Sequence, residues 1–237
     1  LVEPPAADFV LNHEAWQMID QQVASGMAWD YSQPSRFVQY SPLLRQFAAE
    51  LNLTRDPDPL TLVRRLNSAI NERLDYAQDS TDVDSTIDHA LELRSGVCQD
   101  FTHIMLSVLR LIGIPSRYVS GYLFHRVENT RERLSADASH AWIEAWLPDL
   151  GWVGFDPTNN VLAGNRHLRV AVGRDYSDVP PTHGIFKGGA RSKLEVAVQV
   201  RRADEKLLAD KPSQLTGWSP IEGGNIAEYY QQQQQQQ

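Results

Sequence analysis

The chain has 237 residues, which is enough to bury one sizeable hydrophobic core. Hydrophobic residues make up 42% of it and charged residues 22%, a composition typical of a globular protein. Its net charge of −8 argues against nucleic acid or an anionic membrane as the main partner, and the longest apolar stretch, near 104–114, is too short to cross a bilayer.

The first part of the chain is predicted to be helical. Helical spacing begins near Asn12, and a second helix is expected after Ser41, a potential N-cap that proline follows. Apolar residues recur every three or four positions over 60–76, which predicts a third helix. Segments rich in aspartate, proline, serine and threonine predict loops at 54–59 and 79–86.

A further helix is predicted from Cys98, the only cysteine, to about Ile112. Gly113 follows, and glycine is the residue type that most often ends a helix. Residues 116–124 predict a strand, whereas the charged segment 125–137 has no steady period and predicts a surface loop.

From residue 138 the pattern changes to a period of two, which is typical of a strand. His140 and Trp142 share one face of this strand, and small and aliphatic side chains share the other. The turn PDLG and the short strand WVGFDP come next, so we expect an antiparallel hairpin. Further strands are expected at 167–173 and 193–201.

Helices precede strands along the chain, so the predicted fold class is α+β, with the helix that begins at Cys98 packed on an antiparallel sheet. We divide the chain into a helical lead-in region at 1–90, a core at 91–202 and an irregular tail at 203–237. The tail ends in a run of glutamines, a low-complexity composition that cannot pack a core.

Cys98, His140 and Asp156 are together candidates for nucleophilic chemistry. A helix N-terminus carries a partial positive charge and N–H groups, which favour a thiolate and can bind an oxyanion. A neutral imidazole at His140 could take the thiol proton, and the Asp156 carboxylate could fix that imidazole. A nucleophile must also be accessible. Taken singly, each of these residues is more often structural: a small buried hydrophobe, a hydrogen-bonded histidine or a turn former.

The residues around these three resemble a known family. GVCQDFTHIMLSVLRLIGIPSRYVSGYL and ASHAWIEAWLPDLGWVGFDPTNN resemble the transglutaminase-like superfamily, in its bacterial branch of papain-like cysteine enzymes. The resemblance is close over 94–160 and continues through HLRVAVGRDYSDVPPTHGIFKGG, at 167–189. It implies a papain/transglutaminase-like catalytic core with Cys98 as nucleophile, His140 as base and Asp156 as the orienting acid. Relatives often carry an N-terminal β-rich domain, and because this sequence begins at LVEPP we expect that domain to be absent or to have been removed.

Two residues are candidates for supporting the reaction. Gln99 could donate to an oxyanion or simply face solvent, and Trp142 could wall a peptide cleft, as could the two later tryptophans of the hairpin. Core packing is the preferred interpretation for at least two of the three tryptophans. Asp100 is expected to cap the helix, and His103 to be a packed histidine. HExxH, CxxC and glycine-rich phosphate loops are absent from the sequence, so neither a metal nor another cofactor is predicted.

The predicted function is thiol-dependent acyl transfer on a peptide or protein substrate, with hydrolysis by a peptidase or amidase preferred. The alternatives are a transglutaminase that joins proteins through isopeptide bonds and a non-catalytic module that binds peptides on the same scaffold. One cysteine excludes an internal disulfide, and a signal peptide is not recognisable in Leu1–Val10, so a reducing, cytoplasmic location is expected.

Overall fold

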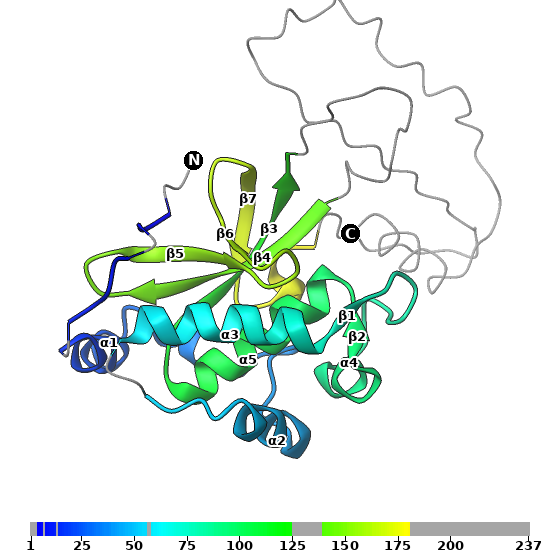
Figure 1. The fold of residues 1–237 in the computed structure, drawn as a ribbon, viewed down its shortest axis with the longest axis horizontal. Coiled ribbons are helices and arrows are strands. Elements are labelled where there is room, and N and C mark those ends of the chain that lie inside the picture. The colour runs from blue at the N-terminus through cyan, green and yellow to red at the C-terminus, as the bar shows by residue number, and fades with distance from the viewer. Residues whose placement is uncertain (1–3, 7, 13, 56–57, 125–138, 181–237) are drawn as a thin grey trace, which may run out of the picture.

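The computed structural model describes residues 4–6, 8–12, 14–55, 58–124 and 139–180. The predicted loop at 125–137, the predicted strand at 193–201 and the tail at 203–237 lie outside these residues. Within them, helices come first and an antiparallel sheet follows, which confirms the predicted α+β class (Figure 1).

Helices fill most of the chain up to residue 112. Their bounds are α1 (Ala15–Ala24), α2 (Pro42–Glu50), α3 (Pro59–Arg73), α4 (Ile87–Leu93) and α5 (Cys98–Ile112), with short 3-10 helices at Trp29–Ser32 and Tyr176–Asp178.

The strands form two sheets. A short parallel pair, β1 (Asp75–Tyr76) and β2 (Ser95–Gly96), precedes α5. The main sheet has the order β6-β5-β4-β3-β7, and all its neighbouring strands are antiparallel. Its strands are β3 (Ser116–Leu123), β4 (Ser139–Leu147), β5 (Gly151–Asp156), β6 (Val161–Leu162) and β7 (His167–Gly173).

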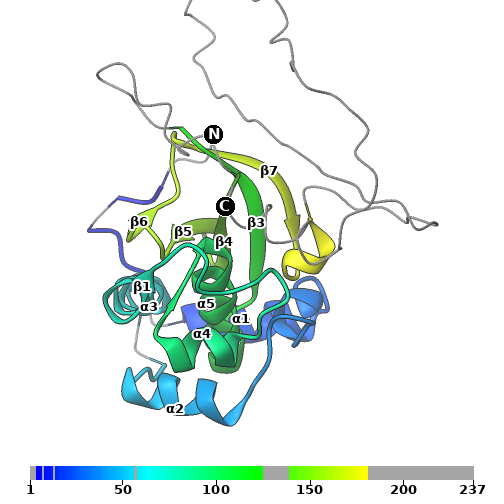
Figure 2. The same ribbon diagram turned by 90° about the vertical axis from the view of Figure 1, so that its right-hand side faces the viewer.

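Helix α5 packs on β3 and β4, and α2, α3 and α4 pack around α5 on the same side of the sheet (Figures 1 and 2). The main core lies between these layers. It receives Ala141 and Ile143 from the inward face of β4, as the alternation predicts. Trp142, from the opposite face, belongs to a separate small cluster with Val119 and Ala163.

Local sequence signals place several helix ends correctly. Helix α2 begins at Pro42, and the Ser41 hydroxyl accepts a hydrogen bond from the Leu44 amide at 3.0 Å. Helix α5 ends before Gly113, whose φ of +97° suits a residue without a Cβ. The sequence missed α4, because its 7 residues span too few turns to show a helical period. Among the described residues, every helix is too short or too polar to span a membrane.

Candidate active site

Cys98 is the first residue of α5, and the segment before it explains why the helix starts there. Val97 is extended, and its amide donates to the Asp100 carboxylate at 2.9 Å. The same carboxylate oxygen accepts from the Thr81 hydroxyl at 2.6 Å. A Cβ on Gly96 would lie 2.7 Å from the Asp100 Cβ, so only glycine allows this close approach. The predicted capping role of Asp100 is confirmed.

The Cys98 side chain is completely buried, whereas the sequence interpretation required an accessible nucleophile. Burial excludes water from the thiol and strengthens its electrostatic interaction with nearby groups.

The β4–β5 hairpin brings His140 and Asp156 together. Ile143 pairs with Phe155 in the register, which places the start of β4 beside the end of β5. His140 Nε2 lies 2.8 Å from Asp156 Oδ2. The sequence predicted the hairpin, and this register supplies the contact that alternation alone could not.

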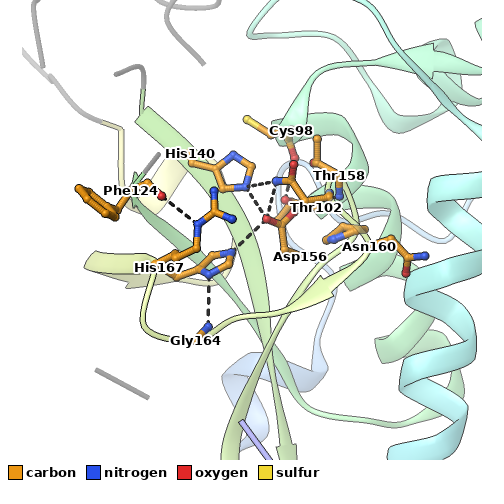
Figure 3. A network of polar contacts seen from close by, with 12 residues as sticks. Cys98, Thr102, Phe124, His140, Asp156, Thr158, Asn160, Gly164 and His167 are labelled. Atoms are coloured by element: carbon orange, nitrogen blue, oxygen red, sulfur yellow. Dashed lines mark hydrogen bonds and ion pairs between the residues drawn. The ribbon is translucent and has the colours of Figure 1, made fainter. Parts of the chain in front are cut away.

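His140 lies between Cys98 and Asp156 (Figure 3). Burial favours the neutral imidazole, but hydrogen bonds to Asp156 and Cys98, together with the negative charges of both, raise the pKa of His140 to about 10. Because Nε2 faces Asp156, we assign Nδ1 as the ring nitrogen that serves Cys98. The imidazole thus links the thiol to the carboxylate.

Asp156 is fully buried and is held by donors on both oxygens. Oδ1 accepts from the amides of Thr158 and Asn159, each at 3.1 Å, and Oδ2 accepts from the Asn159 side chain at 2.7 Å. Burial alone would raise the pKa of Asp156, yet hydrogen bonds from His140, His167 and Asn159 hold it well below its usual range. The carboxyl is therefore ionised at neutral pH.

Helix α3 holds the turn that follows Asp156. The Asn71 side chain donates to the carbonyls of Pro157 and Thr158 at 3.1 and 2.8 Å. The Asn160 side chain accepts from Ser68 at 2.9 Å. The DPTNN segment thus has a structural role, since its turn supplies three of the donors to Asp156 and is hydrogen-bonded to a helix far away in sequence.

His167, at the start of β7, is a site residue that sequence analysis did not single out. Its Nε2 lies 3.1 Å from Asp156 Oδ2, and its Nδ1 accepts from the Gly164 amide at 3.2 Å. The segment was predicted only as a strand. Its histidine reaches Asp156 because of the strand order in the sheet, and local spacing carries no signal of that order.

Part of the chain is similar to known proteins. Residues 45–157 match the family model described as the transglutaminase-like superfamily. Residues 45–157 form a transglutaminase-like core. An uncharacterized protein of Mycobacterium leprae is 40% identical over 164 residues, which cover 69% of this chain and 58% of that protein. The chain thus spans little more than half the length of that relative.

Two further similar proteins are named after different types of enzyme. A protein-glutamine gamma-glutamyltransferase of Pseudomonas aeruginosa is 34% identical over 126 residues, which cover 51% of this chain and 19% of that protein. A solved "putative cysteine protease" from Cytophaga hutchinsonii is 25% identical, with a TM-score of 0.57 over 71% of this chain and 53% of that chain. The fold of residues 45–157 is therefore that of transglutaminase-like and papain-like proteins.

Trp142 packs beneath His140 and His167. Its ring centroid lies 6.1 Å from that of His140 and 5.1 Å from that of His167, and its side chain is buried. A Cβ on Gly121 would lie 2.6 Å from the Trp142 ring and 2.2 Å from the Leu168 carbonyl oxygen, so this glycine leaves room for the ring. Trp142 supports the site by packing.

The other candidates serve mainly structure. The Gln99 side chain is buried and does not face solvent, and its amide donates to the Val83 carbonyl at 2.9 Å, which ties the 79–86 loop to the start of α5. Trp146 packs partly buried against the main core, whereas Trp152 contacts Tyr31 with ring centroids 5.3 Å apart. His103 is buried and accepts from the Tyr176 amide, as expected of a packed histidine.

Potential metal-ligating atoms of His140, Asp156 and His167 lie within 4.8 Å of one another. The hydrogen bonds of His167 indicate whether these atoms are suited to binding a metal. Because Gly164 donates to His167 Nδ1, the ring proton resides on Nε2 and points at Asp156. A protonated nitrogen has no lone pair for a metal, so this trio is suited to hydrogen bonding and not to metal coordination.

Proposed function

We propose that the chain is a thiol-dependent acyl-transfer enzyme acting on peptide or amide carbonyls. Cys98 is the nucleophile, His140 the general base and acid, and Asp156 the group that orients the imidazole. The observation that carries this proposal is the continuous set of contacts from the thiol through His140 to Asp156, at the N-terminus of α5.

In the first half of the reaction, His140 takes the thiol proton and the sulfur attacks the carbonyl carbon. A C–S bond forms, and the carbonyl electron pair moves onto the oxygen. The N–H groups at the start of α5, including that of Cys98, bind this oxyanion. His140 then gives its proton to the leaving nitrogen, the C–N bond breaks, an amine or ammonia departs, and a thioester on Cys98 remains.

In the second half, we favour water as the acceptor. His140 removes a proton from the water as its oxygen attacks the thioester, the C–S bond breaks, and the proton returns to the Cys98 thiolate while the carboxylic acid leaves. Asp156 stays ionised and stabilises the imidazolium in both halves. The similarity to the Cytophaga hutchinsonii protein supports hydrolysis.

A transglutaminase reaction is the alternative, in which a primary amine attacks the same thioester and an amide forms. The similarity to the Pseudomonas aeruginosa gamma-glutamyltransferase favours it. A non-catalytic peptide-binding module is less well supported, because a scaffold without chemistry has no need to keep the three residues in mutual contact.

The test compares the purified chain with Cys98→Ala on a glutamine-containing protein substrate such as casein. Three products are measured: new amino termini, released ammonia and incorporation of a fluorescent primary amine. New termini or ammonia without incorporation supports a hydrolase, whereas incorporation supports a transglutaminase. Loss of every product in Cys98→Ala is expected, since the members of a triad act as a unit. Equal product release by both proteins would refute thiol catalysis.

A further inference from the structure

A second imidazole contacts the acid of the proposed triad on the side away from the thiol. Oδ2 of Asp156 accepts from His140 at 2.8 Å, from the Asn159 side chain at 2.7 Å and from His167 at 3.1 Å (Figure 3). His167 is only 8% exposed, so water cannot readily replace it as a donor.

The protonation state of His167 follows from its two partners. The Gly164 amide can only donate, so Nδ1 must be the unprotonated nitrogen, and Nε2 carries the hydrogen toward Asp156. A second proton on Nδ1 would point at the Gly164 N–H. The ring therefore serves as a neutral donor, although a carboxylate lies beside it.

The other groups around His167 agree with a neutral ring. The Trp142 ring meets it edge to face at 74°, and the His140 ring centroid lies 6.2 Å away. When His140 holds a proton, its positive charge disfavours a second one on His167. Asp156 is the only carboxylate within the hydrogen-bonded group that the described residues form here.

Three donors on one oxygen have two physical consequences. They fix the direction of Oδ2, because the oxygen cannot turn without losing several bonds at once. They also share its negative charge, so that less of it acts on His140. An imidazole that must later release its proton to a leaving amine benefits from this moderation.

We propose that His167 is a positioning residue for the catalytic pair: a neutral N–H donor that keeps Oδ2 of Asp156 directed at His140 and takes up part of its charge. The inference rests on the proposed roles of His140 and Asp156. His167 is then a fourth side chain, beside Cys98, His140 and Asp156, and its role is to set the pKa of His140.

The test is nitrogen NMR of the histidine rings in the full chain, with labelled histidine, from about pH 5 to about pH 11. Wild type is compared with His167→Phe, which keeps a flat ring but no donor, and with His167→Gln, which keeps an N–H near the Nε2 position. Signals are assigned by their loss in His140→Ala and His167→Gln.

We expect the neutral His167 ring to carry its hydrogen on Nε2. We expect His140 to lose its proton about half a pH unit or more higher in His167→Phe than in wild type, and His167→Gln to restore the wild-type value. A merely structural histidine would leave the His140 titration unchanged, and that result would overturn the proposal. So would an Nδ1–H pattern of the neutral His167 ring.

If His167→Phe does not fold, His167→Leu, which also lacks a donor, replaces it in the His140 titration, and the wild-type tautomer of His167 is a separate readout. No turnover is measured, so failure of this inference leaves the proposed function standing. A chain without thiol-dependent turnover would in turn leave the NMR result intact.

Discussion

Replacing Asp156 by asparagine should cost far more stability than the same change at the surface. The carboxylate accepts five hydrogen bonds while fully buried. Oδ1 accepts from two backbone amides, and Oδ2 accepts from two histidines and the Asn159 side chain. Asparagine has nearly the same shape but only one oxygen.

Neither orientation of that asparagine satisfies the site. With its oxygen in the place of Oδ2, its NH2 group faces the amides of Thr158 and Asn159. In the opposite orientation, the NH2 group takes the place of Oδ2 and faces three side-chain donors. His140 Nε2 can then accept from this NH2 group only if the ring proton moves to Nδ1. At least two donors then lack an acceptor. Because the amides of Thr158 and Asn159 are only part-buried, their cost lies toward the lower end of about 1–3 kcal/mol each, so the free energy of unfolding should fall by about 2 kcal/mol.

Urea unfolding near neutral pH, followed by tryptophan fluorescence, measures this change. The matched control is Asp84→Asn, whose ion pair with Arg36 is largely exposed and should contribute less than about 1 kcal/mol. An Asp156→Asn protein that unfolds within about 1 kcal/mol of wild type would refute the reasoning, since it would show that the five contacts do not stabilise the fold.

Three further predictions concern the same site. Because the pKa of His140 is raised to about 10, the folded chain keeps a proton that the unfolded chain releases above about pH 6.5. The free energy of unfolding of wild type relative to His140→Gln should therefore be greatest below about pH 6.5 and should decline toward pH 10. Urea unfolding at several pH values measures this difference. Alkylation of Cys98 by iodoacetamide should be slower in the folded chain than in the urea-unfolded chain, because its side chain is completely buried, and equal rates would contradict that burial. Gly121→Ala should lower the free energy of unfolding by about 1–3 kcal/mol, because its Cβ would lie 2.2 Å from the Leu168 carbonyl oxygen. The control is Gly164→Ala, whose Cβ would have its nearest contact at 3.6 Å. In the same urea assay this control should change the free energy of unfolding only slightly.

The sequence by itself determined the local elements and singled out the candidate reacting groups. Helix α5 runs from Cys98 to Ile112, as its apolar spacing and the following glycine predict. The alternation at 139–147 correctly assigns Ile143 to the inner face and Trp142 to the outer face of β4. These features depend on side-chain periodicity and capping within a few residues, so a single segment carries all the information. The transglutaminase-like fold followed from motifs of this kind.

Tertiary structure alone decided how these groups meet. The β4–β5 register brings His140 to Asp156, the strand order carries His167 to the same carboxylate, and packing buries Cys98 against expectation. Gln99 likewise finds its partner on a loop that no local pattern connects to it. Hydrogen bonds and burial depend on which segments the folded chain places side by side, and residues far apart in sequence carry no periodic signal of that pairing.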